Sequence, residues 1–511
     1  MSYKGILILD FGSQFTQLIA RRIREMKVYC EIHPCTEPFQ PDWQYDGIIL
    51  SGGPASVLGD TAPVVDPRWL STEIPTLGVC YGMQLLAQHT GAVLERGQKR
   101  EYGQSTLQLS GEHLFTRGLP TASIAWMSHG DHVEEAGEQW SVLGRSDTGV
   151  IALMTHKLHP WVTVQFHPEV AHTQYGEHLL QNFVLGMCQS PQTWTMGHFI
   201  TEQVSALQAK IGSDHVICGL SGGVDSSVTA ALLQKAIGPR LHCIFVDNGL
   251  LRQGEREAVE QEFFELDLTV VDASTQFLTA LDGITDPEQK RKTIGRVFIE
   301  VFEREANRLS KRHGEIQWLA QGTLYPDVIE SLSFRGPSAT IKSHHNVGGL
   351  PENMNFVLIE PLRELFKDEV RALGLELGLS HQRVFRHPFP GPGLAVRMLG
   401  PITAERLSLL RRADQIFIEE IHNFGWYDKI WQAGVVFLPV KSVGVMGDDR
   451  TYEWTVALRA VHSKDGMTAD VVRLPWELLE RVSTRIINEI EGINRVAYDV
   501  SHKPPATIEW E

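Results

Sequence analysis

A thiol lies in the sequence where an enzyme would place a nucleophile. Gly78-Val79-Cys80-Tyr81-Gly82 has G-x-C-x-G spacing and separates an apolar stretch from an amphipathic one. Glycines around the reactive residue permit a sharp turn from strand to helix, as in a nucleophile elbow. At a helix start the dipole favours a thiolate, and nearby backbone N–H groups can bind an oxyanion. The alternative for Cys80 is a buried cysteine in an ordinary turn.

A nucleophilic thiol needs a base and a group that orients the base, and the segment 162–169 offers both. A strand-like run leads to His167 in a proline-locked turn, and Glu169 lies two residues on. In an extended segment this spacing puts both side chains on one side. Ser51-Gly52-Gly53-Pro54 allows a close backbone approach and a second oxyanion donor. Each of these segments alone is only a turn; beside Cys80 they predict a Cys-His-Glu triad.

A second chemical motif is Ser221-Gly222-Gly223-Val224-Asp225-Ser226-Ser227, between a buried strand and a helix. Small residues there leave backbone N–H groups pointing at an anion, with the helix N-terminus behind them. The Gly-Lys-Ser/Thr ending of a Walker A loop is missing. The structural alternative is a helix start capped by Asp225 or Ser226.

Alternating strand and helix patterns must position these motifs. Residues 1–190 predict an α/β domain with a mostly parallel sheet, ending at the polar break Gln189–Thr193. A second α/β pattern covers residues 191–386 and stops near a Pro/Gly cluster, His387–Gly393, which neither a helix nor a central strand tolerates. A long helix and strand-like stretches then predict a smaller α+β domain over residues 387–511.

Composition bounds the class of protein. At 511 residues the chain is too long for one domain. A net charge of −16 argues against nucleic acid as a partner, because such partners are bound through Lys and Arg. No apolar run approaches the ~20 residues of a membrane span. Six cysteines without a C-x-x-C pair indicate a reducing, cytoplasmic location.

The first motifs resemble the class I glutamine amidotransferases. The resemblance covers roughly residues 4–188 and includes Asp10–Gln14 and Met127–Asp131. It implies that Cys80 attacks the glutamine amide carbon, that His167 passes a proton to departing ammonia, and that Glu169 holds the imidazole. It further implies an oxyanion hole and glutamine contacts from Gly53, Tyr81, Gln84, Ser128 and His129.

The loop Ser221–Ser227 is similar to the pyrophosphate loop of the N-type ATP pyrophosphatases, which have an adenine nucleotide alpha hydrolase-like fold with a parallel sheet. These enzymes adenylate an oxygen of the acceptor, and a nucleophile then displaces AMP. The resemblance implies ATP as co-substrate, Mg²⁺ as cofactor and Asp225 as metal ligand. The implied ATP-binding residues are Ser221, Gly222, Gly223, Val224, Asp225, Ser226, Ser227, Asp247 and Lys342.

Enzymes of the N-type ATP pyrophosphatase class, which carry this loop, make asparagine, argininosuccinate, NAD, thiolated tRNA or GMP. A Cys-type class I glutaminase fused ahead of it resembles the GMP synthetase family, and matching segments extend to the C-terminus. The resemblance implies conversion of XMP to GMP with ammonia from glutamine. It also implies a homodimer through the C-terminal domain, a lid carrying Lys342, and XMP contacts from Arg291, Lys503, Thr507 and Glu509.

Several of these assignments have plain structural alternatives. The basic run Lys290–Lys292 by pattern alone is a solvated helix face, and a chain end such as 503–511 is normally frayed. His344 and His345 suggest a metal, but adjacent residues do not face together on a helix or strand. The N-terminal domain could also be a degenerate glutamine-binding regulator in a synthetase that uses free ammonia.

Overall fold

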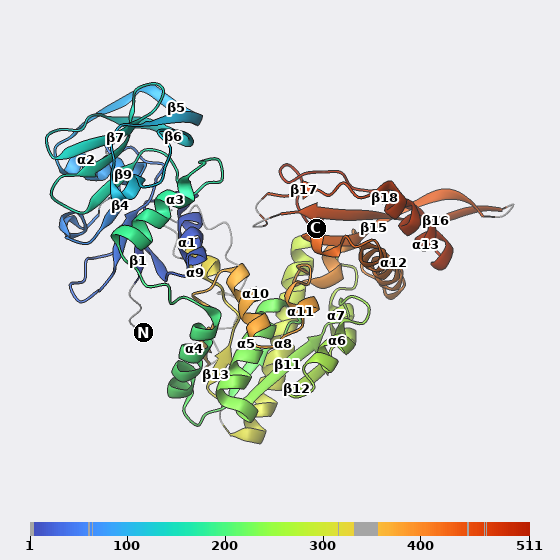
Figure 1. Ribbon diagram of the computed structural model, residues 1–511. Coiled ribbons are helices and arrows are strands. Elements are labelled where there is room, and N and C mark those ends of the chain that lie inside the picture. Colours follow the sequence, from blue (N-terminus) through green and yellow to red (C-terminus); the bar gives the residue numbers. More distant parts are fainter. Residues whose placement is uncertain are drawn as a thin grey trace. The chain divides into compact units, whose positions relative to one another are not determined.

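The computed structural model describes residues 5–59, 62–63, 65–314, 316–331, 356–446, 449–463, 466 and 468–511 (Figure 1). The described residues divide into two compact units, the first comprising those up to 199 together with 328–331, and the second comprising 200–327 and those from 356 onward. The predicted fold class is confirmed, with α/β organisation around each chemical motif. The division into three domains at residues 190 and 386 stays a prediction.

The first unit is built on a nine-stranded sheet with the order β2-β1-β3-β4-β9-β8-β7-β5-β6. Its parallel half is apolar because both faces are buried, and β3, β4 and β9 are buried at every residue. This half comprises β1 (Ile6–Asp10), β2 (Cys30–Pro34), β3 (Gly47–Leu50), β4 (Thr76–Val79) and β9 (Trp161–Val164).

The other half of this sheet is antiparallel, which the sequence did not indicate. It consists of β5 (Val93–Leu109), β6 (Ala122–Glu135), β7 (Trp140–Arg145) and β8 (Ile151–His156). The polar composition of β5 gives no buried-strand signal, so the sheet is only half parallel. Helices α1 (Thr16–Glu25), α2 (Tyr81–His89) and α3 (Gly176–Gln181) belong to this unit, and α4 (Met196–Ile211) follows.

The second unit contains a five-stranded, fully parallel sheet with the order β12-β11-β10-β13-β14. The strands are β10 (Val216–Gly219), β11 (Leu241–Asp247), β12 (Asp267–Asp272), β13 (Trp318–Ala320) and β14 (Val357–Ile359). The chain runs outward from β10 in one direction through β11 and β12, and in the other through β13 and β14. In such sheets ligands bind at the carboxyl ends of the strands beside this reversal.

Helices accompany this sheet. They are α5 (Val224–Ile237), α6 (Glu255–Glu262), α7 (Ser274–Ala280), α8 (Pro287–His313), α9 (Tyr325–Ser331), α10 (Lys367–Glu376) and α11 (His381–Val384). The α8 helix starts at the N-cap Asp286, whose side chain accepts from the Gln289 N–H, and its last turn is basic, which suits the helix dipole.

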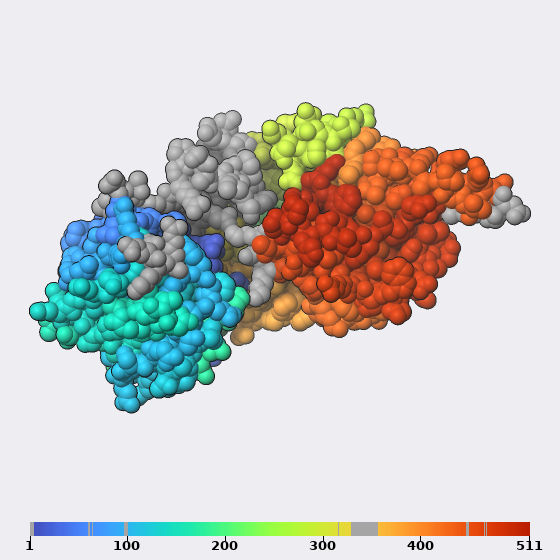
Figure 2. Space-filling view, turned by 90° about the horizontal axis from the view of Figure 1, so that it is seen from above, coloured from blue at the N-terminus to red at the C-terminus, as the bar shows by residue number. Residues whose placement is uncertain are grey.

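A third sheet lies towards the C-terminus of the second unit. Long strands β15 (Gln432–Met446) and β16 (Asp449–His462) form an antiparallel pair that projects from the sheet, while β17 (Asp470–Val471) and β18 (Ile493–Tyr498) both pair with β16 (Figures 1 and 2). Helices α12 (Ala404–Asn423) and α13 (Trp476–Glu489) pack on it. One continuous apolar cluster runs from Ile217 of β10 to Ile493 of β18, so both sheets share a core.

None of the helices in the described part of the chain combines the length and the apolar character that a bilayer crossing requires.

Candidate active sites

Cys80 occupies a strained turn between β4 and α2. Its φ of +51° lies in the left-handed region, which is uncommon for a residue with a side chain. Glycine is required on both sides: a Cβ on Gly78 would meet the Gly82 carbonyl oxygen at 2.7 Å, and one on Gly82 would meet the Leu50 carbonyl oxygen at 2.3 Å. The backbone therefore holds the thiol at the helix start, as the G-x-C-x-G spacing predicts.

His167 and Glu169 form a buried pair beside this thiol. His167 Nδ1 lies 2.7 Å from Glu169 Oε1. Burial disfavours the charged imidazole, but hydrogen bonds to Cys80 and Glu169 outweigh it and raise the pKa of His167 to about 10. Phe15 packs edge-on against the imidazole, with ring centroids 5.0 Å apart. The ring is thus protonated at neutral pH and held in one orientation by the carboxylate.

A cavity of about 450 Å³ opens over the thiol. Seven of the eight predicted glutaminase residues line it, and Glu169 lies behind His167. The seven are Gly53, Cys80, Tyr81, Gln84, Ser128, His129 and His167. The Tyr81 N–H is the first of α2 and has no partner within the helix, which suits an oxyanion donor. A Cβ on Gly53 would meet the Phe11 carbonyl oxygen at 2.8 Å, so the close backbone approach expected there is present.

Gln165 and Glu101, which were not predicted, hold side chains of this cavity in place. Gln165 donates to Cys80 Sγ at 3.6 Å and accepts from Gln84 at 3.3 Å. His129 Nε2 lies 3.0 Å from Glu101 Oε2. Burial opposes ionisation of Glu101, but hydrogen bonds, led by that from His129, lower its pKa to about 2. Glu101 lies on the polar strand β5, and nothing local in the sequence linked it to the site.

The loop 221–227 lies at the carboxyl end of β10, where the strand order reverses. Ser221 and Ser226 hydroxyls lie 3.0 Å apart, and Ser227 Oγ donates to the Gly223 carbonyl at 2.8 Å. A Cβ on Gly322, just after β13, would come within 3.1 Å of the Asp225 backbone. The structure therefore brings the ends of β10 and β13 together around the predicted phosphate loop.

Basic side chains converge on this loop from later in the chain. Lys367 Nζ contacts both carboxylate oxygens of Asp225, at 2.7 and 2.6 Å. Arg383 and Arg386 each donate to the Gly222 carbonyl, at 2.9 and 2.8 Å. None of these three cations was predicted, because each is more than 140 residues from its partner.

The remaining predicted ATP residues fall in two places. Asp247 ends β11, and its Oδ1 accepts from the Gly249 N–H at 2.9 Å. Lys342 lies outside the described residues.

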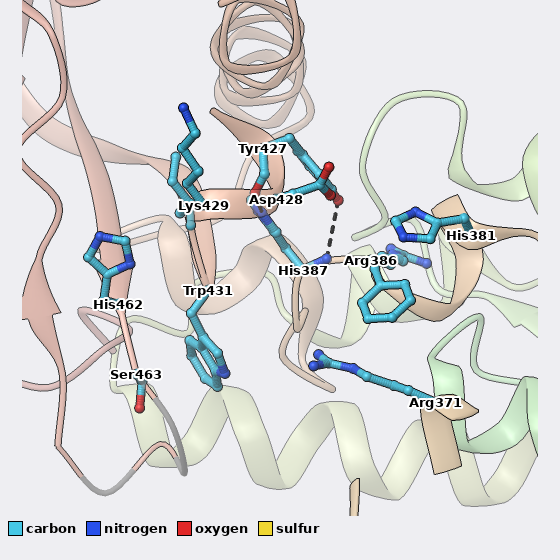
Figure 3. Close-up of a pocket in the computed structure, with 12 residues that line it drawn as sticks. Arg371, His381, Arg386, His387, Tyr427, Asp428, Lys429, Trp431, His462 and Ser463 are labelled. Carbon is cyan, nitrogen blue, oxygen red and sulfur yellow. Dashed lines mark hydrogen bonds between the residues drawn. The ribbon is translucent and has the colours of Figure 1, made fainter. Parts of the chain in front are cut away.

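A second cavity, of about 480 Å³, lies near the Pro/Gly segment in the second unit. Figure 3 shows Arg371, Arg386 and Lys429 around it, together with a hydrogen bond from the His387 N–H to the Tyr427 hydroxyl at 3.1 Å. The His387 and Tyr427 rings stack with centroids 3.8 Å apart. The lining is basic, which favours anionic ligands, but no residue predicted to bind XMP is part of it.

The C-terminal segment is tied into the protein rather than frayed. The buried Arg397 donates two 2.9 Å hydrogen bonds to the Glu509 carboxylate. The Thr507 carbonyl accepts from Arg459 at 2.7 Å, and Lys503 Nζ donates to the Gly466 carbonyl at 2.7 Å. The predicted XMP residues Lys503, Thr507 and Glu509 thus lie in one ordered segment.

The basic run on α8 meets the same segment. Lys290 is fully buried, donating to the Met398 carbonyl at 2.7 Å and pairing with Glu511. Arg291 donates to the Glu511 carbonyl. The alternative of a solvated helix face is therefore wrong for Lys290, and Arg291 contacts the C-terminal segment, while their assignment to XMP stays a prediction.

Comparisons with known proteins cover the whole chain. Residues 7–187 match the family described as glutamine amidotransferase class-I, residues 195–250 match NAD synthase, and residues 419–510 match the GMP synthase C terminal domain. Three similar relatives are each called GMP synthase (glutamine-hydrolyzing). The protein from a Nitratiruptor species is 56% identical over 516 residues, covering 99% of each chain.

The other two are equally extensive. The Carboxydothermus hydrogenoformans protein is 55% identical over 511 residues, and the Desulfotalea psychrophila protein is 54% identical over 513 residues; each alignment covers 99% of both chains. With such identity over its full length, the chain belongs to the family of glutamine-hydrolysing GMP synthases.

Proposed function

We propose that this chain makes GMP from XMP, using ATP and ammonia released from glutamine. Family membership carries the overall reaction. The assignment of the two reactions to two sites rests on two separate groups of residues, the Cys80 triad in the first unit and the phosphate loop in the second. An intact triad speaks against the alternative of a degenerate regulatory domain. The proposed domains are residues 1–190, 191–386 and 387–511.

In the glutaminase step, Cys80 Sγ attacks the amide carbon of glutamine and forms a thioester. The protonated His167, whose pKa is raised to about 10, gives its proton to the departing ammonia. Water then hydrolyses the thioester to glutamate, with His167 as base. Glu169 keeps the imidazole oriented, and the N–H groups of Gly53 and Tyr81 stabilise the oxyanion. Gln84, Ser128 and His129 hold the substrate.

In the synthetase step, the 2-oxygen of xanthine attacks the α-phosphate of ATP and pyrophosphate leaves. Ammonia then attacks carbon 2, and AMP leaves. Ser221, Ser226 and Ser227, with the N–H groups of the loop, bind pyrophosphate. Asp247 lies at the strand end where the adenine and ribose of ATP would bind. Arg291, Lys503, Thr507 and Glu509 are assigned to XMP, and Lys342 is assigned to ATP.

Asp225 fits a magnesium ligand. Mg²⁺ binds through one or two carboxylates together with substrate phosphates and water, and Asp225 offers a carboxylate at the mouth of the phosphate loop. Its oxygens face Lys367, so this position already attracts a cation. When bound with ATP, Mg²⁺ would neutralise phosphate charge.

A second copy of the chain is the proposed partner of the β15–β16 pair. Large apolar side chains are exposed there: Val443 lies opposite Tyr452 in the register, Val445 lies two residues on, and Val445 and Tyr452 are 72% and 59% exposed. Alternation along the strand puts Val443 and Val445 on one face. Such a face favours self-association over solvent.

A cytoplasmic location of the enzyme is also proposed. It is supported by the six free cysteines, because such thiols persist in a reducing compartment.

A direct assay tests the proposal. The full chain is mixed with ATP, Mg²⁺, glutamine and XMP, and the products are separated. We expect equal amounts of GMP, AMP, pyrophosphate and glutamate. Formation of ADP and phosphate, or GMP formation from ammonium with no hydrolysis of glutamine, would contradict the proposed chemistry.

A further inference from the structure

Three histidines meet at the edge of the parallel sheet opposite the phosphate loop. His215 precedes β10, His242 is the second residue of β11, and His313 ends α8. The His215 and His242 rings stack with centroids 5.0 Å apart, and the His313 ring is tilted by 34° against His242 with centroids 4.2 Å apart. One nitrogen from each ring lies within 4.8 Å of the others. We propose that these imidazoles bind a divalent transition-metal ion, Zn²⁺ being the best match.

The hydrogen bonding favours a metal site over a simple ring stack. Asp267 Oδ2 lies 2.5 Å from His242 Nδ1, and because a carboxylate only accepts, that nitrogen carries the proton. The neutral His242 ring then has its lone pair on Nε2, which faces His215 Nδ1 at 2.8 Å. A carboxylate that fixes the tautomer of a histidine is the usual outer support of a metal-bound imidazole.

The third ring supplies an unused ligand atom. His313 Nε2 is buried and has no hydrogen-bond partner among the described residues. Burying a polar nitrogen without a partner is unfavourable, and a metal ion in the cluster would remove that cost. Since His215 and His313 are half-buried and His242 is buried, the cluster is open to solvent on one side.

Geometry and charge suit Zn²⁺. Three imidazoles with an open fourth position form a known zinc donor set, and Zn–N bonds of about 2.0–2.1 Å put ligand nitrogens roughly 3.3 Å apart in a tetrahedron. His215 Nδ1 and His242 Nε2 would separate by about half an ångström, within the freedom of side-chain rotation. Asp267 adds a negative charge that partly offsets the ion.

The bound metal would stabilise the fold by linking separate elements, and it would take no part in ATP chemistry. The four residues of β10 separate His215 from the loop that follows, a distance on the order of 13 Å. A metal would join the start of β10, the start of β11 and the end of the 27-residue helix α8.

Metal uptake by the full chain tests this inference. All proteins carry Cys80→Ala, so that the catalytic thiol does not bind the probe, and Mg²⁺ is present to occupy oxygen sites. Zn²⁺ is added by equilibrium dialysis and the bound metal is counted; Co²⁺ reports tetrahedral geometry through its visible absorption. His313→Gln and His215→Gln remove single ligands. His89→Gln is the matched control, because His89 is the exposed last residue of α2.

We expect one Zn²⁺ per chain in the parent and in His89→Gln, with affinity reduced at least ~10-fold in His313→Gln and His215→Gln. Zn²⁺ should raise the melting temperature of the first two proteins and not of the others, while ammonium-dependent activity shows that all are folded. No stoichiometric uptake by the parent would leave only a hydrogen-bonded ring stack. Equal uptake by all four proteins would place the metal elsewhere, for example at Glu95, His132 and Glu134; either result overturns the inference.

Discussion

Lys367 places its ammonium against both carboxylate oxygens of Asp225, although the two residues lie 142 positions apart. Lys367 is the first residue of α10, and Asp225 lies in the first turn of α5. Both side chains are partly exposed, so the pair contributes little to stability on its own. Its position matters more, because Mg²⁺ would compete with this ammonium for the carboxylate, and ATP phosphates would compete with the carboxylate for the ammonium.

The first prediction separates these two charges. Asp225→Asn should keep the fold, because Asn also suits a helix start. It should lower the rate of ATP turnover with XMP, with glutamine or ammonium alike, because up to several kcal/mol of transition-state stabilisation is lost. Lys367→Met removes the cation that competes with Mg²⁺ for this carboxylate, so it should lower the Mg²⁺ concentration needed for turnover, whereas Asp225→Asn should raise it. If only the glutamine reaction suffered in Asp225→Asn, the assignment of the loop to ATP would be wrong.

The second prediction concerns the thiol. Cys80→Ala should reduce glutamine-dependent GMP synthesis by about 10³-fold or more and leave ammonium-dependent synthesis intact. Cys35→Ala is the control: this thiol is buried in the same unit, and burial raises its pKa to about 11, so it does not supply a thiolate. Loss of both activities in a folded Cys80→Ala protein would refute the two-site arrangement.

The third prediction follows from the raised pKa of His167. Charged His167 stabilises the folded state fully below its ordinary pKa of 6.5, and this stabilisation is lost as the pH rises towards 10. The gap in unfolding free energy between the parent and His167→Gln should therefore shrink between these values. Glu169→Gln removes a hydrogen bond and a charge, so NMR titration should show a lower pKa for His167. An unchanged pKa would mean that Glu169 does not hold the imidazolium.

Local patterns predicted both reactive centres because each of their motifs consists of a few adjacent residues at the end of a strand. The turn at Cys80, the His-x-Glu spacing and the loop at Ser221 all carry their geometry in adjacent residues. The parallel strands were recognisable for the same reason, since burial on both faces makes them continuously apolar.

Long-range partners could not be read in this way. Glu101, Lys367 and Arg397 lie on elements whose own sequence shows only an exposed strand, a helix start or a turn. Their role depends on which distant element folds against them. Lys290 is the clearest case: its neighbours in sequence are exposed, and its burial is made tolerable by the distant side-chain carboxylate of Glu511 and the Met398 carbonyl.

The fourth prediction concerns self-association. Val445→Glu on the exposed face of β15 should convert a dimer to monomer, as measured by light scattering, because a charge opposes burial of that face. Glu477→Gln on α13 is a surface control that should leave the dimer unchanged. A dimer that persists in Val445→Glu would place the interface elsewhere.

The last prediction concerns the C-terminal segment. Deleting residues 503–511 would remove the partners of the buried cations Lys290 and Arg397, which should cost about 3–5 kcal/mol for a broken buried pair. The truncated protein is therefore expected to lose stability as well as XMP binding, and point variants are the sharper probe. Lys503 is only half-buried, and its ammonium contacts a single carbonyl.

Lys503→Met should accordingly raise the XMP concentration required several-fold at saturating ATP and ammonium, while the melting temperature changes little. Arg291→Met should act in the same direction. Lys292→Met, one residue along on the exposed surface of α8, is the matched control and should leave the XMP dependence unchanged. Titrations of XMP with the three folded variants decide the matter: equal behaviour of Lys503→Met and Lys292→Met would mean that this segment stabilises the protein without binding the nucleotide.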